Sequence, residues 1–125
     1  MKVQRSPPTT QSAVNLPELL ARVDHDLVFL SELIAIFKME FPKLLRSLQE
    51  SVAEGDLASV ETVSHGLKGM LAALSVTRSA AIASQIEQLA RAGETAGLAE
   101  ELKRLECEVA DLVPALEACT EGAPL

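Results

Sequence analysis

The sequence contains no tryptophan and no tyrosine, and only three of its 125 residues are phenylalanine. Proteins that hold nucleic acid stack bases on aromatic side chains or follow the phosphate backbone with a basic surface. This chain has almost no aromatic side chains, and its net charge of −7 leaves no basic stripe for a phosphate backbone. We therefore expect that it does not bind nucleic acid. Most of the acidity lies near the C-terminus, where residues 94–121 hold eight acidic and two basic side chains.

Cysteine is scarce too. Cys107 and Cys119 fall on one predicted helix, about 18 Å apart at the helical rise, which is too far for a disulfide between them. Neither has the close cysteine or histidine neighbours that a zinc site requires, so we expect no metal and no other cofactor in this chain.

Long apolar runs and a secretion signal are also missing, and we expect a cytoplasmic protein that does not insert into membranes.

Helix-forming residues, by contrast, are abundant. Alanine, leucine and glutamate dominate and the hydrophobic fraction is 48%, which favours helices over sheets. The length suffices for one domain with a core of its own. We predict an all-α fold, an antiparallel up-and-down four-helix bundle with a short extra N-terminal helix. The bundle is expected over residues 16–121, between a flexible arm or linker at residues 1–15 and a tail at residues 122–125.

Apolar spacing and capping residues predict where the first helices lie. A short helix is expected over residues 16–23, with a proline in its first turn. A longer helix follows, with Asp24 or Asp26 as its N-cap. Its apolar stripe continues past Pro42, so we predict a single helix that is kinked there.

A Glu-Gly-Asp turn at residues 54–56 predicts the end of the long helix and the start of the next one, which should end near Ser75. Another helix is predicted from about Thr77 to Ala92, before a glycine. The last helix is expected to run from about Leu98 to Cys119, with Pro114 bending its final turns.

The helix that follows residue 56 carries a histidine on its polar side. His65 projects roughly 170° away from the centre of the apolar stripe, so we expect it to face water. Lys68 lies on the neighbouring turn and can reach an anion attached to the ring, while Gly69 leaves the ring uncrowded. An exposed histidine beside a cation suits a group that one protein hands to another. The stripe consists of Val60, Val63, Leu67, Met70, Leu71 and Leu74.

The stretch S-H-G-L-K-G-M-L-A-A-L-S at residues 64–75 resembles the signature of the histidine-containing phosphotransfer (HPt) domains, H-x-L-K-G followed by small and apolar residues. The resemblance extends over about residues 16–119 and includes the A-E-G-D turn and the downstream I-E-Q-L-A-R-A-G. It implies an intermediate in a multistep phosphorelay, which takes a phosphoryl group from an aspartate of one receiver domain and delivers it to another.

The resemblance also implies roles for single residues. His65 would be phosphorylated, Lys68 would stabilise the phosphoryl oxygens, and Gly69 would give the partner access. Glu87 matches a position where the family often has a polar residue near the histidine. It either orients the ring by accepting its other N–H or forms an ordinary ion pair with Arg91, four residues on. The receiver would bring Mg²⁺, so none is expected here.

The sequence departs from the family pattern in a few places. Gly66 follows the histidine where a side chain is more common, and Ser75 stands where a glycine commonly ends the helix. His25 matches no motif and is expected to be a surface residue. None of these departures affects His65 or Lys68.

Three functions remain open at this point. The resemblance implies a monomeric carrier without its own ATP site, free-standing or part of a hybrid histidine kinase, whose partners are receiver domains of response regulators or hybrid sensor kinases. An alternative is a helical adaptor that docks receiver or kinase domains without being phosphorylated. The dimerisation helices of a sensor kinase are disfavoured, because the chain has no glycine-rich nucleotide loop and is too short for an ATP-binding domain.

Overall fold

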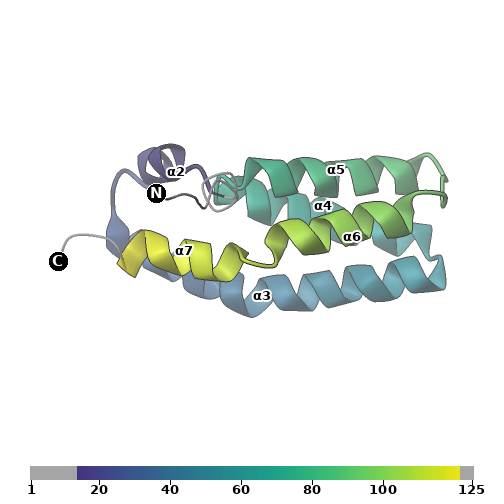
Figure 1. The fold of residues 1–125 in the computed structure, drawn as a ribbon, viewed down its shortest axis with the longest axis horizontal. Coiled ribbons are helices and arrows are strands. Elements are labelled where there is room, and N and C mark those ends of the chain that lie inside the picture. Colours follow the sequence, from purple (N-terminus) through teal and green to yellow (C-terminus); the bar gives the residue numbers. More distant parts are fainter. Residues whose placement is uncertain (1–13, 122–125) are drawn as a thin grey trace, which may run out of the picture.

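The structure is a computed structural model that describes the backbone of residues 14–121 and the side chains of residues 14–119. Within that range it contains six helices and no strand, which confirms the predicted all-α fold (Figure 1). Residues 1–13 of the predicted arm and the predicted tail lie outside the described residues. The helices are α2 (Leu16–Arg22), α3 (Leu27–Glu54), α4 (Leu57–Ala73), α5 (Thr77–Arg91), α6 (Leu98–Val109) and α7 (Leu112–Glu121).

Val14 and Asn15 belong to the folded part of the chain, although they fall within the predicted arm. Val14 is buried, and the side chain of Asn15 caps α2 by accepting a hydrogen bond from the backbone N–H of Glu18 at 3.2 Å. The N–H of Asn15 donates to the carbonyl of Ser75, in the turn between α4 and α5. These two residues of the predicted arm therefore contact the bundle, and Asn15 ties the start of α2 to the end of α4.

The long helix α3 continues without interruption through Pro42. Asp26, one of the two predicted caps, begins it by accepting a hydrogen bond from the N–H of Phe29 at 3.0 Å. The apolar stripe faces the core on both sides of the proline, since Phe41 before it and Leu48 after it are both buried. The predicted continuity is confirmed, whereas a kink at Pro42 stays a prediction.

The turn between α3 and α4 follows the predicted Glu-Gly-Asp pattern. Gly55 ends α3 with a φ of 72°, a left-handed conformation that favours glycine. Asp56 then begins α4 by accepting a hydrogen bond from the N–H of Ser59 at 3.2 Å. The six residues of the predicted stripe are all buried or partly buried, so α4 turns the expected face to the core.

The prediction of a single last helix was wrong. It is divided into α6 and α7, and Ala110 and Asp111 separate the two. Pro114 explains the break, because it has no N–H to donate to the carbonyl of Ala110 and its ring would clash with that carbonyl in a continuous helix. The chain restarts with the carbonyl of Asp111 accepting from the N–H of Ala115 at 3.1 Å. Pro114 is then the third residue of α7, where no N–H is needed.

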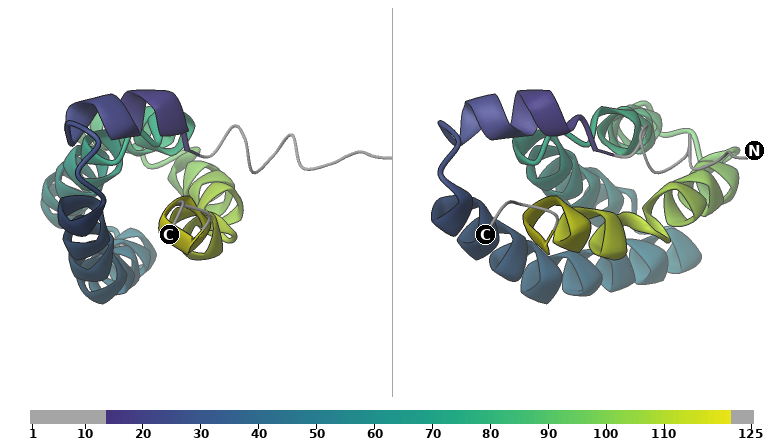
Figure 2. Two further views of the ribbon diagram at one scale, coloured as in Figure 1. Left: turned by 90° about the vertical axis from the view of Figure 1, so that its left-hand side faces the viewer. Right: turned by 60° about the vertical axis from the view of Figure 1, so that its left-hand side comes forward.

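The helices form a bundle of four rods, in which α6 and α7 together make the fourth. α4 packs against α3 and α5, while α6 packs against α5 and α3, and α7 against α3. α4 is therefore diagonally opposite the divided rod, as the end-on view in Figure 2 illustrates. α2 lies across one end of the bundle, where its Leu19 and the following Val23 are buried. The predicted four-helix bundle with a short extra helix is confirmed.

The core is almost entirely aliphatic. Its only aromatic contact in the described residues is the stacking of Phe37 on Phe41, with ring centroids 4.6 Å apart. Burial of this kind is the main favourable contribution to folding. The largest fully buried side chains come from every helix: Leu19, Leu30, Phe37, Leu48, Leu67, Leu71, Ile86, Leu105, Leu112 and Leu116.

Candidate functional site

α4 turns His65 to solvent, as predicted. The side chain of His65 is 67% exposed, although its neighbour Ser64 is completely buried. Ser64 directs its hydroxyl back to the carbonyl of Val60, at 2.6 Å, so this buried polar group is paired within the helix. The ring of His65 is therefore supported by a well-packed helix while remaining open to another molecule.

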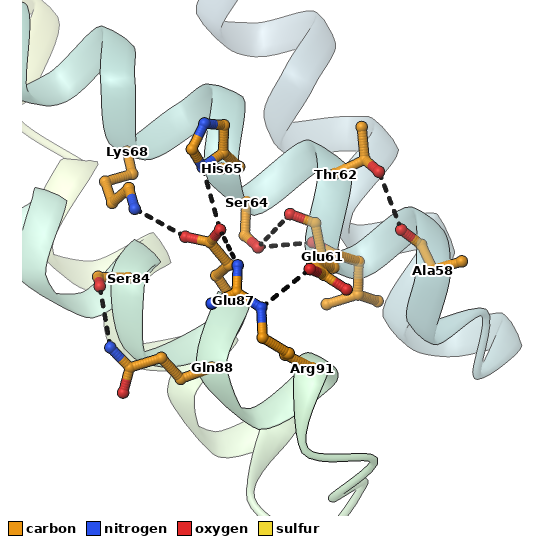
Figure 3. A network of polar contacts seen from close by, with 11 residues as sticks. Ala58, Glu61, Thr62, Ser64, His65, Lys68, Ser84, Glu87, Gln88 and Arg91 are labelled. Atoms are coloured by element: carbon orange, nitrogen blue, oxygen red, sulfur yellow. Dashed lines mark hydrogen bonds and ion pairs between the residues drawn. The ribbon is translucent and has the colours of Figure 1, made fainter.

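One nitrogen of the imidazole ring contacts a residue of α5. Nδ1 of His65 lies 3.0 Å from Oε2 of Glu87, a residue whose side chain is only 5% exposed (Figure 3). Figure 3 also shows the other ring nitrogen directed away from Glu87. An ionised carboxylate can only accept hydrogen bonds, so Nδ1 carries the proton and Nε2 of the neutral ring carries a lone pair. The exposed nitrogen is thus the nucleophilic one.

Two cations share the same carboxylate. Nζ of Lys68 lies 2.8 Å from Oε1 of Glu87, and Nη2 of Arg91 lies 2.8 Å from Oε2. Arg91 also donates from Nε to Oε2 of Glu61, at 3.0 Å, and Glu61 lies on α4 one turn before His65. The residues therefore form one network between α4 and α5, centred on a buried glutamate (Figure 3).

The network keeps Glu87 ionised in spite of its burial. The hydrogen bond from Lys68 lowers the pKa of Glu87 below its usual value, against the opposing effect of burial, and the contact with His65 lowers it further. The pKa of Arg91 is raised, above all by its hydrogen bond with Glu61. The charge of this buried carboxylate is balanced by the groups that donate hydrogen bonds to it, so the carboxylate is stable in its deprotonated form.

Two glycines, Gly66 and Gly69, leave two solvent-facing positions of α4 near His65 without a side chain. A Cβ atom added at Gly69 would meet nothing within 4 Å, and one added at Gly66 would meet only Cδ1 of Leu44, at 3.9 Å. Packing within the protein therefore does not require glycine at either position. An open depression of about 320 Å³ lies beside the ring, and its lining comprises Glu61, Thr62, His65, Glu87 and Arg91.

A model of the Hpt domain family matches residues 32–119, most of the chain and the whole of the site. The chain belongs to the Hpt domain family. Hpt domains serve histidine phosphotransfer in two-component signalling, where they interact with receiver domains, and they are phosphotransfer carriers that do not bind ATP as kinases do. Comparisons with curated proteins and with solved structures found no match.

The structure of this Hpt domain brings three of the four predicted site residues into one cluster. His65 and Lys68 both contact Glu87, while Gly69 makes no such contact and lies on the uncovered surface of α4. The two interpretations of Glu87 do not exclude each other, because its carboxylate contacts both the ring and Arg91.

The contact between Glu61 and Arg91 was not predicted from the sequence. Helical spacing did place each beside a site residue, since Glu61 is four residues before His65 and Arg91 is four residues after Glu87. Their contact with each other depends on how α4 and α5 are rotated, which the spacing within one helix does not report.

Other candidate residues lie apart from the site. His25 is exposed in the connection between α2 and α3, as predicted, and Cys107 and Cys119 are both free thiols. No group of three or more metal-binding side chains occurs among residues 14–119. Each helix within residues 14–121 is either too short or too polar to span a lipid bilayer.

Proposed function

We propose that this Hpt domain is a phosphorelay intermediate that accepts a phosphoryl group on Nε2 of His65 from a receiver-domain aspartate and passes it to another receiver domain. The observation that carries the proposal is the contact between Nδ1 and Glu87, because it leaves the Nε2 lone pair on an exposed ring. A neutral imidazole is nucleophilic near neutral pH, so this nitrogen can attack phosphorus without a separate base.

Lys68 supplies positive charge for the phosphoryl oxygens. Its side chain is about one third exposed, and its ammonium group contacts Glu87, the same carboxylate that contacts the ring. A lysine side chain is long and flexible, so it can turn from the carboxylate to a phosphoryl group on His65 and form a charge-assisted hydrogen bond there. Gly69 gives the partner access, and Glu87 orients the ring.

An apolar groove next to the site helix suits the docking of a receiver domain. Its lining comes from α3 and α4 and comprises Leu33, Ile36, Phe37, Met70, Ala73 and Leu74. Ile36 is 56% exposed, and the exposed Val28, Phe29 and Met39 belong to the same helix, α3. Exposed apolar side chains in such number favour contact with another protein. The receiver is expected to supply Mg²⁺ and the acidic cluster, and this protein is expected to act as a monomer without a cofactor.

Incubation with a phosphorylated receiver domain and Mg²⁺ tests the proposal. We expect an acid-labile, base-stable label on the wild type and none on His65→Gln, and chelation of Mg²⁺ should prevent labelling. A helical adaptor would dock the receiver equally well in both forms and take no label in either. Screening a panel of receivers for rapid transfer would then identify the donor and the acceptor.

A further inference from the structure

The carboxylate of Glu87 contacts His65 at the nitrogen opposite the one proposed to carry the phosphoryl group. This carboxylate is almost completely buried and is held ionised by Lys68 and Arg91. Because it can only accept hydrogen bonds, it favours every form of the ring that has a proton on Nδ1. That preference has different consequences before and after phosphorylation.

Phosphorylation changes the hydrogen bonding of Nδ1. In the free neutral ring, a proton on Nδ1 leaves the lone pair on Nε2. Once Nε2 is bonded to phosphorus, a neutral ring has its lone pair on Nδ1, and that lone pair would face a carboxylate oxygen 3.0 Å away. Two acceptors at this distance repel each other, whereas a ring that keeps its Nδ1 proton is a cation and pairs with the carboxylate.

We propose that Glu87 keeps the proton on Nδ1 throughout the transfer cycle, so that phosphorylated His65 is held as a cationic phosphoimidazolium that gives up its phosphoryl group readily. This inference rests on the proposed function of His65. It makes Glu87 a positioning residue that sets how long the phosphorylated carrier lasts.

In both transfer steps the ring keeps its proton on Nδ1, and only the bonds to phosphorus change. The Nε2 lone pair attacks phosphorus, the bond between phosphorus and the donor aspartate oxygen breaks, and its electron pair leaves with the donor carboxylate. The ring then holds the phosphoryl group on Nε2, the proton on Nδ1 and one positive charge beside Glu87. In the second transfer an acceptor carboxylate oxygen attacks phosphorus, and the electron pair of the broken bond returns to Nε2.

No other carboxylate in the described residues contacts the ring. α4 places Lys68 and Glu61 near His65, and α5 places Glu87 and Arg91 there, but Glu61 is bonded to Arg91 instead of the ring. On α3, Cδ1 of Leu44 lies 3.9 Å from the position of a Cβ added at Gly66. The proton on Nδ1 therefore depends on Glu87 alone, and this makes a single substitution informative.

The variant Glu87→Gln removes the charge and keeps the shape. Its amide can accept from a protonated Nδ1 or, when turned over, donate to a deprotonated one, so the phosphorylated ring is free to become neutral. Both proteins are phosphorylated with the small-molecule donor phosphoramidate, which needs no receiver, and loss of the label is followed over time. We expect the phosphorylated variant to last about tenfold longer at about pH 8, which corresponds to exchanging a charged for a neutral hydrogen bond.

The pH profile separates this role from a structural one. Wild-type lifetimes should stay nearly constant between about pH 6 and about pH 8, because the ring keeps its proton, whereas Glu87→Gln lifetimes should lengthen as the pH rises. Nitrogen NMR of the wild type provides a second measurement, with His65→Gln used for assignment. It should find Nδ1 of the phosphorylated ring protonated at about pH 8.

Two controls accompany this comparison. Glu108→Gln removes a carboxylate that pairs with Arg78 away from the ring and should leave the lifetime and its pH profile unchanged. Glu87→Gln also releases Lys68, so the comparison is repeated in a Lys68→Ala background. The difference between Glu and Gln at residue 87 should persist there if the proton on Nδ1 is the cause.

Parallel pH profiles with equal lifetimes, or a deprotonated Nδ1 in the phosphorylated wild type, would overturn the inference. Failure of phosphoramidate to label His65 would also overturn it, because a proton on Nδ1 leaves Nε2 free to react. Labelling by phosphoramidate without labelling by any receiver would instead refute the proposed relay, while the measured lifetimes would still decide the role of Glu87.

Discussion

Two kinds of ion pair lie on this bundle, and they use the same residue types in different surroundings. Between α4 and α5, a single buried carboxylate, Glu87, contacts a histidine, a lysine and an arginine. Between α5 and α6, Arg78 pairs with Glu108 at 3.0 Å, and within α6 Arg104 pairs with Glu101 at 3.1 Å. The carboxylates differ in exposure, since the side chains of Glu108 and Glu101 are 23% and 20% exposed and that of Glu87 only 5%.

The difference teaches that burial, more than the number of opposite charges, distinguishes the site. Exposed pairs contribute little, because water and salt screen them and both side chains lose freedom. A carboxylate that is almost removed from water must be satisfied by its neighbours, so its partners are held in defined positions. The α4–α5 network can therefore orient a ring, whereas the Arg78–Glu108 and Arg104–Glu101 pairs contact no such group.

The largest expected effect comes from deleting the buried carboxylate. Glu87→Ala should lower the free energy of unfolding by about 2 kcal/mol, because it removes several charge-assisted hydrogen bonds at once. Glu108→Ala is the matched control and should cost less than about 0.5 kcal/mol. Chemical denaturation of both variants measures the two values, and equal losses would show that the proposed distinction between the pairs is wrong.

The next effect concerns transfer instead of stability. Lys68→Ala should slow phosphoryl transfer about tenfold, through loss of one charge-assisted contact to the phosphoryl oxygens, while the free energy of unfolding changes by less than about 1 kcal/mol. Arg78→Ala, on the other side of α5, should leave the transfer rate unchanged. A large drop in melting temperature together with unchanged transfer per folded molecule would refute the role of Lys68.

A smaller effect tests whether the absence of a side chain at Gly69 matters for transfer. Gly69→Ala should raise the stability by about 1 kcal/mol, because alanine is the better helix former and the added Cβ meets nothing. Transfer should nevertheless slow, since the new methyl group stands where a receiver must approach the ring. Gly66→Ala gives the comparison: similar stabilisation is expected with less effect on transfer. Unchanged transfer in Gly69→Ala would contradict the access role.

The smallest effect is a dependence of stability on pH. The pKa of Glu87 is lowered in the folded protein from an ordinary value of 4.5, so its contribution is present above that pH and is lost as the pH falls through the folded-state pKa. Burial opposes the favourable contacts, which keeps the net effect small. Denaturation from neutral to acidic pH should give a steeper loss for the wild type than for Glu87→Gln. Glu108→Gln should follow the wild type.

Periodicity predicted most of the fold because it reports which face of each helix is buried. It placed the stripe of α4 and the exposure of His65 correctly, and the caps Asp26 and Asp56 marked two of the helix starts. The break before α7 was missed because the apolar stripe continues across it, and only the lost hydrogen bond before Pro114 reveals it.

The site was predicted in its parts but not in its arrangement. The sequence pattern pointed to His65, Lys68 and Glu87, yet the position of Glu87 at the centre depends on the rotation of α5 against α4. The burial of Ser64 was also hidden, because its hydroxyl is satisfied within its own helix. Such features arise from contacts between distant residues, which spacing along one helix does not encode.

The interruption between α6 and α7 should also appear in amide hydrogen exchange. Around Ala110 the helical ladder is missing, and the amide there makes only a long contact of 3.4 Å with the carbonyl of Cys107. α6 and α7 are then expected to open as two separate cooperative units, each at a lower free energy than the uninterrupted α3. Because this rod lies diagonally across from α4, we expect local opening there to leave His65 and its contact with Glu87 in place.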